Sequence, residues 1–214
     1  LLAQLQSGAT YTVTLDQSRE IQLADNLTDT FQPAAGGTFT DVPATHWAAG
    51  AVAFVSSQGL LQGTGASAFA PGQPMTRAML VTALWREAGS PVVNYAMDFD
   101  DVDEDQWYTE AVRWAASEGI VTGTGKGFSP DAALTRESLA AILFRYAGGQ
   151  ADADQLDSYA DGAGVSAWAR EAMNWAVAQG LITGKSGGRL DPGGTASRAE
   201  VSAILMRYVQ SAQA

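Results

Sequence analysis

The chain has 214 residues, 46% of them hydrophobic, which is enough to form a sizeable buried core. Its formal net charge of −11 argues against binding to nucleic acid or to an anionic membrane surface, because both are bound mainly through Lys and Arg. The absence of cysteine excludes disulfides, thiolate metal sites and cysteine nucleophiles, and no apolar stretch is long enough to span a bilayer.

Residues 1–38 differ in pattern from the rest of the chain. Residues 10–15 and 20–23 alternate polar and apolar side chains as half-buried strands do, and residues 16–18 have the composition of a turn. We therefore predict a short β-hairpin-like segment, the end of an upstream β domain, followed by a linker over residues 32–37. Because the chain does not begin with Met, we expect it to be a piece of a longer protein.

From Phe39 onward the sequence repeats three times with a period of about sixty residues, and we predict repeats at 39–89, 98–148 and 159–209. Each repeat opens with an aromatic residue two positions before an aspartate. A Trp follows, and a second aromatic residue stands seven positions later, on the same face of a helix. The matched positions are Asp41, Asp101 and Asp161, then Trp47, Trp107 and Trp168, then Phe54, Trp114 and Trp175. Cap-forming residues two positions before each Trp predict that the first helix begins there, at Thr45, Asp105 and Ser166.

Glycines mark the end of this first helix and the loop after it. A left-handed residue is expected just past the helix, and the glycines in that place are Gly59, Gly119 and Gly180. Gly63, Gly123 and Gly184 then open a glycine-rich loop that leads to the second helix, and Gly89 and Gly148 end the second helix in the first two repeats.

A hydroxyl residue followed by an arginine opens each second helix, at Thr76-Arg77, Thr135-Arg136 and Ser197-Arg198. Ser197 and Glu200 form a complete capping box, whereas Met79 and Ser138 stand where Glu would close the other two. An arginine in the first turn gains nothing from the helix dipole, so its recurrence needs another explanation. Apolar residues follow at i, i+3 and i+4 spacing, and we predict a mainly α protein whose three helix-loop-helix repeats pack around a shared core.

Together these motifs resemble the S-layer homology domain over residues 39 to about 209, although Gly162 and Leu190 depart from its pattern in the third repeat. The resemblance implies a pseudo-threefold trimer within one chain, with one helix per repeat in a central bundle. It also implies that grooves between repeats bind secondary cell-wall polymers, often with pyruvylated amino sugars. Such a protein is extracellular and is held at the bacterial cell surface or cell wall.

The resemblance further implies that the motif arginines, with the caps Thr76, Thr135 and Ser197, contact the acidic sugar. It implies that the tryptophans and the loop glycines Gly63, Gly123 and Gly184 line the grooves. Physical chemistry allows such a site, because unpaired N–H groups at a helix N-terminus attract an anion and a guanidinium binds a carboxylate through two hydrogen bonds. The arginines that these considerations concern are Arg77, Arg136 and Arg198.

Each of these assignments has a structural alternative. Every motif arginine has the alternative of pairing with an acidic residue of a neighbouring repeat. Stacking of Trp47, Trp107 and Trp168 on sugar rings competes with packing of the same side chains in the core. We assign the second aromatic residues to the core, and the later arginines, near the helix C-termini, to structural roles. Those arginines are Arg86, Arg145 and Arg207.

Other candidate chemistry fails on spacing. Gly184-Lys185-Ser186 lacks the earlier glycine of a phosphate-binding loop, the acidic run 98–105 lacks the glycine and the bidentate Glu of a calcium loop, and His46 has no His or Cys partner. We expect no enzyme, no cofactor and no metal site. We predict a monomeric module, without nucleic-acid partner or membrane insertion, that anchors a surface protein by binding an acidic cell-wall polysaccharide. Two alternatives are a protein–protein or self-assembly module and the C-terminal anchor of a secreted hydrolase.

Overall fold

The computed structural model describes residues 12–15, 19–22, 39–123, 125, 127–150 and 154–212. Strand β1 (Thr12–Leu15) pairs antiparallel with β2 (Arg19–Gln22), with Val13 opposite Ile21. The predicted turn at 16–18 and the predicted linker at 32–37 lie outside the described residues.

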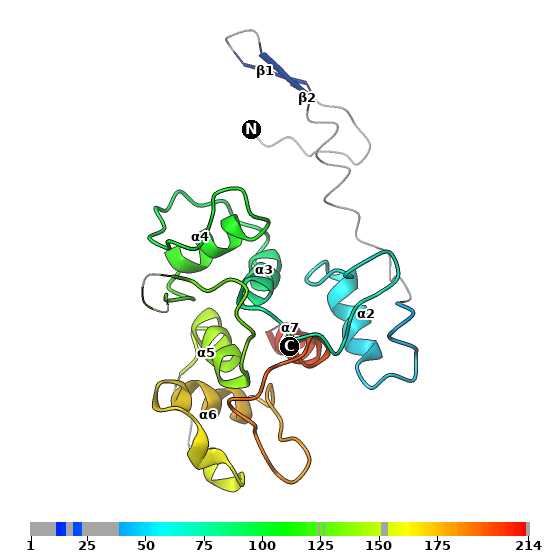
Figure 1. Ribbon diagram of the computed structural model, residues 1–214, viewed down its shortest axis with the longest axis vertical. Helices are drawn as coiled ribbons and strands as arrows, with labels where there is room; N and C mark the ends of the chain where they lie inside the picture. Colours follow the sequence, from blue (N-terminus) through cyan, green and yellow to red (C-terminus); the bar gives the residue numbers. More distant parts are fainter. Residues whose placement is uncertain are drawn as a thin grey trace.

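The remaining described elements are helical, which confirms a mainly α protein (Figure 1). The helices come in pairs along the chain: α2 (Ala49–Ser57) and α3 (Arg77–Glu87), α4 (Thr109–Ser117) and α5 (Arg136–Tyr146), and α6 (Arg170–Ala178) and α7 (Arg198–Ala212). Three short 3-10 helices precede α6, namely η1 (Leu156–Ser158), η2 (Gly162–Gly164) and η3 (Ala167–Ala169). None of the helices in the described ranges is long and apolar enough to cross a membrane.

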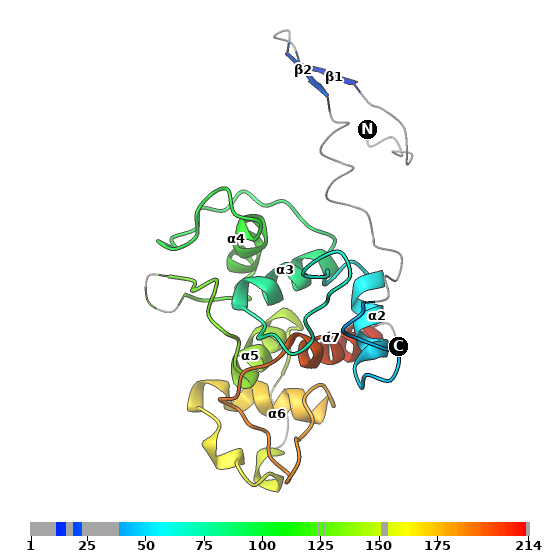
Figure 2. The same ribbon diagram turned by 45° about the vertical axis from the view of Figure 1, so that its right-hand side comes forward.

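The first helix of each pair packs against the second helix of a different pair. Helix α2 lies against α7, α4 against α3 and α6 against α5, and the two views agree on these neighbours (Figures 1 and 2). The predicted i, i+3, i+4 apolar residues of the second helices are all buried, among them Leu80, Leu139 and Val201. The predicted repeats therefore bury one another's apolar faces, as a single helix pair is too small to do alone.

A ring of three backbone hydrogen bonds joins the segments just before the second helices. The N–H of Met75 donates to the carbonyl of Ala196 at 2.9 Å, Ala196 donates to Leu134 at 2.8 Å, and Leu134 donates back to Met75 at 2.8 Å. All three residues are fully buried. Breaking the ring would leave buried polar groups unpaired, so it resists separation of the three segments.

The predicted caps and stops of the second helices are confirmed. In α7 the Ser197 hydroxyl accepts the Glu200 N–H at 3.2 Å and the Glu200 carboxylate accepts the Ser197 N–H at 2.8 Å, which completes the capping box. Thr76 and Thr135 accept one N–H each, from the residue three positions on. The predicted stop glycines have the positive φ that only glycine adopts freely, for example 84° at Gly89.

The predicted start of the first helices is wrong for α2 and α4, which begin after their tryptophans and are not capped by Thr45 or Asp105. In the third repeat Ser166 is the N-cap residue of η3 and Trp168 its second residue, as predicted, but the Ser166 side chain makes no capping hydrogen bond and α6 begins only at Arg170. The reason is a tight turn in which each N–H reaches back three residues, from Ala49 to His46, from Thr109 to Gln106 and from Ala169 to Ser166. This 3-10 geometry delays the first α-helical bond.

Candidate ligand-binding site

The three motif arginines lie between repeats and tie them together. Each Nε donates to a backbone carbonyl in the loop between the two helices of a neighbouring repeat. Each Nη2 donates to an earlier carbonyl of the same loop. Arg136 and Arg198 are only 4% exposed, whereas Arg77 is partly exposed. The bonds run from Arg198 to Phe69 (2.8 Å) and Gln62 (2.6 Å), from Arg136 to Leu190 (2.6 Å) and Thr183 (2.9 Å), and from Arg77 to Phe128 (2.9 Å) and Thr122 (3.5 Å).

Backbone carbonyls, not carboxylates, are thus the main partners of these arginines. The alternative of acidic pairing holds within the described residues for Arg136 alone, whose Nη1 lies 3.8 Å from Glu200 Oε1. Burial lowers the pKa of all three guanidinium groups, which nevertheless titrate too far above neutrality to lose their charge. Arg198 also stacks over Phe69, with 4.4 Å from Cζ to the ring centroid, and Arg77 over Phe128 at 4.8 Å. At Arg136 the matching position is Leu190, which has no aromatic ring.

The helix N-termini themselves are not free to bind an anion, so this part of the sequence argument is wrong. The first two N–H groups of each second helix donate to carbonyls of a neighbouring loop at 2.9–3.1 Å. Three loops thus occupy the groups that a ligand would need. The pairs are Arg77 to Ala132 and Ala78 to Pro130, Arg136 to Gly194 and Glu137 to Pro192, and Arg198 to Gln73 and Ala199 to Pro71.

The repeated aspartates prepare the carbonyls that the arginines bind, a function that the sequence argument missed. Asp41 accepts the N–H groups of Phe69 at 2.9 Å and Ala70 at 2.7 Å, and Asp101 and Asp161 hold the matching residues of their own loops. The second residue of each held pair has a left-handed backbone, with φ of 54–60°. Such a conformation costs energy in a residue with a Cβ. The recurrence of one Asp in every repeat was the available signal.

These hydrogen bonds predict a loss of stability in acid. The N–H of Phe69 is the main reason why the pKa of Asp41 lies below its ordinary value of 3.8. Burial opposes ionisation of Asp161 and Glu200, but backbone N–H groups, together with Arg189 at Asp161 and Lys185 at Glu200, lower both pKa values. A lowered folded-state pKa gives stability that is complete above the unfolded-state pKa and is lost as the pH falls through the folded-state pKa.

The melting temperature should therefore be flat from pH 7 to about pH 5 and fall below about pH 4. A thermal unfolding series should show a shallower fall for Asp161→Asn; an unchanged fall would contradict this origin.

Two surface pockets open beside the arginines, and each draws residues from all three predicted repeats. We name them the Arg77 pocket and the Arg136 pocket. The Arg77 pocket is lined by Val121, Thr122, Gly123, Ser138, Ala141, Ile142, Arg145 and Trp168 beside Arg77 itself. The Arg136 pocket is lined by Trp47, Leu181, Thr183, Gly184, Lys185, Glu200, Ala203, Ile204 and Arg207 beside Arg136.

The pockets contain many of the residues singled out from the sequence, but not all of them. Trp47 and Trp168 are 65% and 59% exposed, so the core alternative is wrong for both, and Trp107 is 58% exposed while lining neither pocket. Trp114 and Trp175 are buried and Phe54 packs on the core, as expected. Thr76, Thr135 and Ser197 cap helices and line neither pocket. Arg198 and Gly63 also line neither pocket.

The loop glycines are required for packing. A Cβ on Gly63 would stand 2.7 Å from the ring of Phe39, and Gly123 and Gly184 meet the matching rings of Phe99 and Tyr159 at 3.0 Å and 2.9 Å. Any side chain there would push the loop away from its own repeat. Two of these glycines, Gly123 and Gly184, also form part of the pocket walls.

The later arginines have a structural role and, in two cases, a place in the pockets. Arg86, Arg145 and Arg207 each donate to a carbonyl just past the end of the first helix of their own repeat, at 3.0–3.5 Å. This supports the structural assignment. Arg145 and Arg207 additionally line the two pockets, which the sequence argument missed because it considered each helix by itself.

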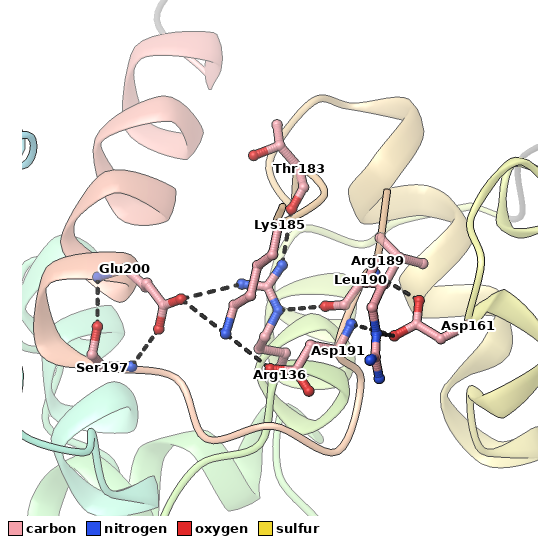
Figure 3. Close-up of polar contacts among 9 residues, drawn as sticks. All are labelled: Arg136, Asp161, Thr183, Lys185, Arg189, Leu190, Asp191, Ser197 and Glu200. Atoms are coloured by element: carbon pink, nitrogen blue, oxygen red, sulfur yellow. Dashed lines mark hydrogen bonds and ion pairs between the residues drawn. The ribbon is translucent and has the colours of Figure 1, made fainter. Parts of the chain in front are cut away.

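The Arg136 pocket contains its own carboxylate (Figure 3). Oε1 of Glu200 lies 3.2 Å from Lys185 Nζ and 3.8 Å from Arg136 Nη1, and Lys185 also pairs with Asp191 at 2.9 Å. Glu200 therefore faces two of the three cations that line this pocket, while the third, Arg207, donates to the Leu181 carbonyl.

Comparison with known proteins identifies the family of the repeats. A family model described as the S-layer homology domain matches residues 38–78, 98–140 and 158–202, together more than half of the chain. The chain belongs to the S-layer homology domain family. Relatives of this S-layer homology chain include the S-layer protein sap of Bacillus anthracis, 29% identical over 81% of this chain and 21% of the relative. Another is the amylopullulanase of Thermoanaerobacterium thermosulfurigenes, 28% identical over 78% of this chain and 9% of the relative.

A solved structure also matches, that of an undecaheme cytochrome from the S-layer of Carboxydothermus ferrireducens. It is 24% identical, with a TM-score of 0.35, over 64% of this chain and 21% of the other. The S-layer homology chain spans about a fifth or less of the curated relatives described above.

Proposed function

We propose that this chain is a non-enzymatic module that anchors a larger protein to the bacterial cell surface by binding an acidic cell-wall polysaccharide. The supporting observation is the pairing of a cation with an exposed indole from another repeat. In the Arg77 pocket the guanidinium of Arg77 shares the walls with Trp168, and in the Arg136 pocket Arg136 shares them with Trp47. A guanidinium binds carboxylates and a flat indole offers an apolar face to a sugar ring.

A strongly acidic chain can bind an acidic polymer if its positive potential is confined to pockets. The net charge is −11, yet arginines line both pockets. Charge of one sign gathered in a concave site raises the local concentration of a ligand of opposite sign. The surrounding acidic surface would then repel polymer from the rest of the molecule and restrict it to the pockets.

We also infer that the repeats 39–89, 98–148 and 159–209 form a pseudo-threefold trimer, with α3, α5 and α7 as its central helices. Three kinds of contact support this arrangement: the hydrogen-bond ring at Met75, the arginine ties, and the packing of each first helix on another repeat. Each contact recurs three times between matched positions. Pockets built from three repeats follow from such an arrangement.

Membership of the S-layer homology family and the presence of S-layer proteins among the relatives agree with a cell-surface location. The matched segment also occurs in an amylopullulanase, of which it covers 9%. This supports the idea that the module is carried by proteins of different activity, among them a secreted hydrolase with its catalytic part elsewhere in the chain.

A sedimentation experiment tests the proposal. The chain should sediment with purified wall sacculi of an S-layer-bearing Gram-positive bacterium and should stay in solution when the secondary polymer has been extracted from the same sacculi. Soluble pyruvylated polymer should release the bound chain. Equal sedimentation with extracted sacculi would contradict the proposal and favour the protein–protein alternative.

A further inference from the structure

The fourth residue of the helix-opening motif lies opposite the arginine of another repeat, and it differs in each of the three places. Nη1 of Arg198 is 3.9 Å from Met79 Sδ, and Nη1 of Arg136 is 3.8 Å from Glu200 Oε1. The matching residue for Arg77 is Ser138, which lines the Arg77 pocket with it. One position thus offers a thioether, a carboxylate and a hydroxyl.

We propose that this position decides which arginine accepts an anionic ligand, and that the Arg77 pocket is the carboxylate-binding pocket of the chain. The inference rests on the proposed function, since it names the place where the acidic polysaccharide binds. It makes the three matched sites unequal, although their backbone hydrogen bonds are alike.

In the Arg136 pocket Glu200 already faces Arg136 and Lys185, which leaves Arg207 as the one lining cation that Glu200 does not pair with (Figure 3). The Glu200 carboxylate faces Lys185 and Arg136 and also accepts the Ser197 N–H of the capping box. A ligand carboxylate must displace it or lie beside a like charge, and both are unfavourable. Asp191 adds a second negative charge at Lys185.

The Arg77 pocket has no carboxylate of its own among its lining residues. No Asp or Glu lines it, and within the described residues neither Arg77 nor Arg145 forms an ion pair. Asp101, an acid that acts on Arg77 electrostatically, is itself held by two backbone N–H groups. The hydroxyl of Ser138 accepts a hydrogen bond from Thr135 at 2.7 Å and brings no charge.

Two like charges in one pocket favour an anion between them. Arg77 donates Nε and Nη2 to carbonyls, which leaves Nη1 without a partner among the described residues. Arg145 lines the same pocket, and its charge adds to burial in lowering the pKa of Arg77. A bound carboxylate relieves this repulsion between the two arginines. Trp168 lines the same pocket, and its indole can pack against the sugar ring to which the carboxylate is attached. With the proposed function, the ligand class that fits this pocket is a saccharide that carries a carboxylate.

The site at Arg198 accepts no anion either. Met79 fills the position with an apolar side chain that packs on the core, and Arg198, unlike Arg77 and Arg136, lines neither pocket. A ligand carboxylate would lose its water there without gaining an accessible partner.

Substitution at Ser138 separates binding from folding. Ser138→Glu completes a capping box with Thr135, as Glu200 does with Ser197, so α5 should be at least as stable as before. The new carboxylate should neutralise Arg77 and weaken binding by at least thirtyfold. Ser138→Gln completes the same box without charge and serves as the matched control, because a loss that it shares with Ser138→Glu comes from size and the remaining difference comes from charge.

The reverse change should open the second pocket. Glu200→Gln keeps the capping box and removes the charge that faces Arg136 and Lys185. Titration calorimetry with the methyl glycoside of a pyruvate-ketal amino sugar should give one site in the parent chain and two in Glu200→Gln. Thermal unfolding of each variant reports its fold.

The outcomes distinguish this inference from the proposed function. If the parent chain binds neither the glycoside nor intact sacculi, the proposed function fails. If it binds both, but Ser138→Glu binds the glycoside as tightly as Ser138→Gln does, the assignment to the Arg77 pocket is overturned while the anchoring function stands. An unchanged number of sites in Glu200→Gln would overturn the explanation given for the Arg136 pocket.

Discussion

Replacing Arg198 with Ala is expected to lower the free energy of unfolding by about 3 kcal/mol. The guanidinium is 4% exposed, donates to the carbonyls of Phe69 and Gln62, and stacks on the Phe69 ring. Without it, two carbonyls between repeats lose their charged donor and a cavity remains where the side chain was. Urea unfolding followed by far-ultraviolet circular dichroism measures the change.

Arg77→Ala is the matched comparison for that result. Arg77 makes the same two kinds of bond, but it is partly exposed and its Nη2 is 3.5 Å from the Thr122 carbonyl, at the limit of a hydrogen bond. The loss should be about 1 kcal/mol. Equal losses in both variants would contradict the claim that burial sets the structural contribution of each arginine. Losses below about 0.5 kcal/mol in both would remove the structural role altogether.

The motif arginines therefore differ in how much they contribute to stability and to ligand binding. Arg198 holds the third repeat to the first and is sealed from solvent, while Arg77 uses the same bonds and keeps one edge toward a pocket. Simultaneous replacement of all three would mix a folding defect with a binding defect. Substitutions at the neighbouring residue, Ser138 or Glu200, change the charge that each arginine meets while leaving the inter-repeat bonds in place.

The elements that follow from local spacing could be predicted from the sequence. The second helices, the capping box at Ser197 and the stop glycines depend on residues within a few positions of each other, so one repeat displays the whole signal. The buried face of each second helix follows from its 3.6-residue period in the same way. Three copies of each pattern made the prediction of a mainly α fold secure.

What could not be predicted depends on which repeats become neighbours. Arg198 and its acceptor Phe69 are 129 residues apart, and a sequence displays the donor without its acceptor. The carbonyls that pair with the helix N-termini are main-chain atoms of other repeats, so no side-chain pattern marks them. The function of Asp41 is hidden similarly, because a left-handed backbone at Ala70 is not expected of alanine.

The tryptophans show how a small local difference decides between an exposed and a buried side chain. Spacing of seven residues to Phe54 places Trp47 on the core face only if both lie on one α-helix. The 3-10 turn before α2 breaks that register and leaves Trp47 outside the helix, 65% exposed. Large exposed aromatic side chains are costly to leave in water and often mark binding surfaces.

Trp168→Ala is expected to weaken binding of the carboxylated saccharide by at least thirtyfold, which corresponds to about 2 kcal/mol. The indole is 59% exposed and shares the walls of the Arg77 pocket with Arg77 and Arg145. A carboxylate bound by the two arginines places its sugar ring beside that indole, and removal of the indole returns the ring to water. Calorimetry with the same pyruvate-ketal glycoside measures the loss.

Two matched variants show whether the pocket or the exposed indole is responsible. Trp107 is 58% exposed but lines neither pocket, so Trp107→Ala should leave binding within about twofold of the parent chain. Trp47→Ala tests the Arg136 pocket and should also be neutral, because Glu200 already faces Arg136 and Lys185 there. In the Glu200→Gln background, however, Trp47→Ala should remove the added second site. Equal losses for Trp47 and Trp168 in the parent chain would mean that both pockets bind, and that the charge at Glu200 does not decide between them.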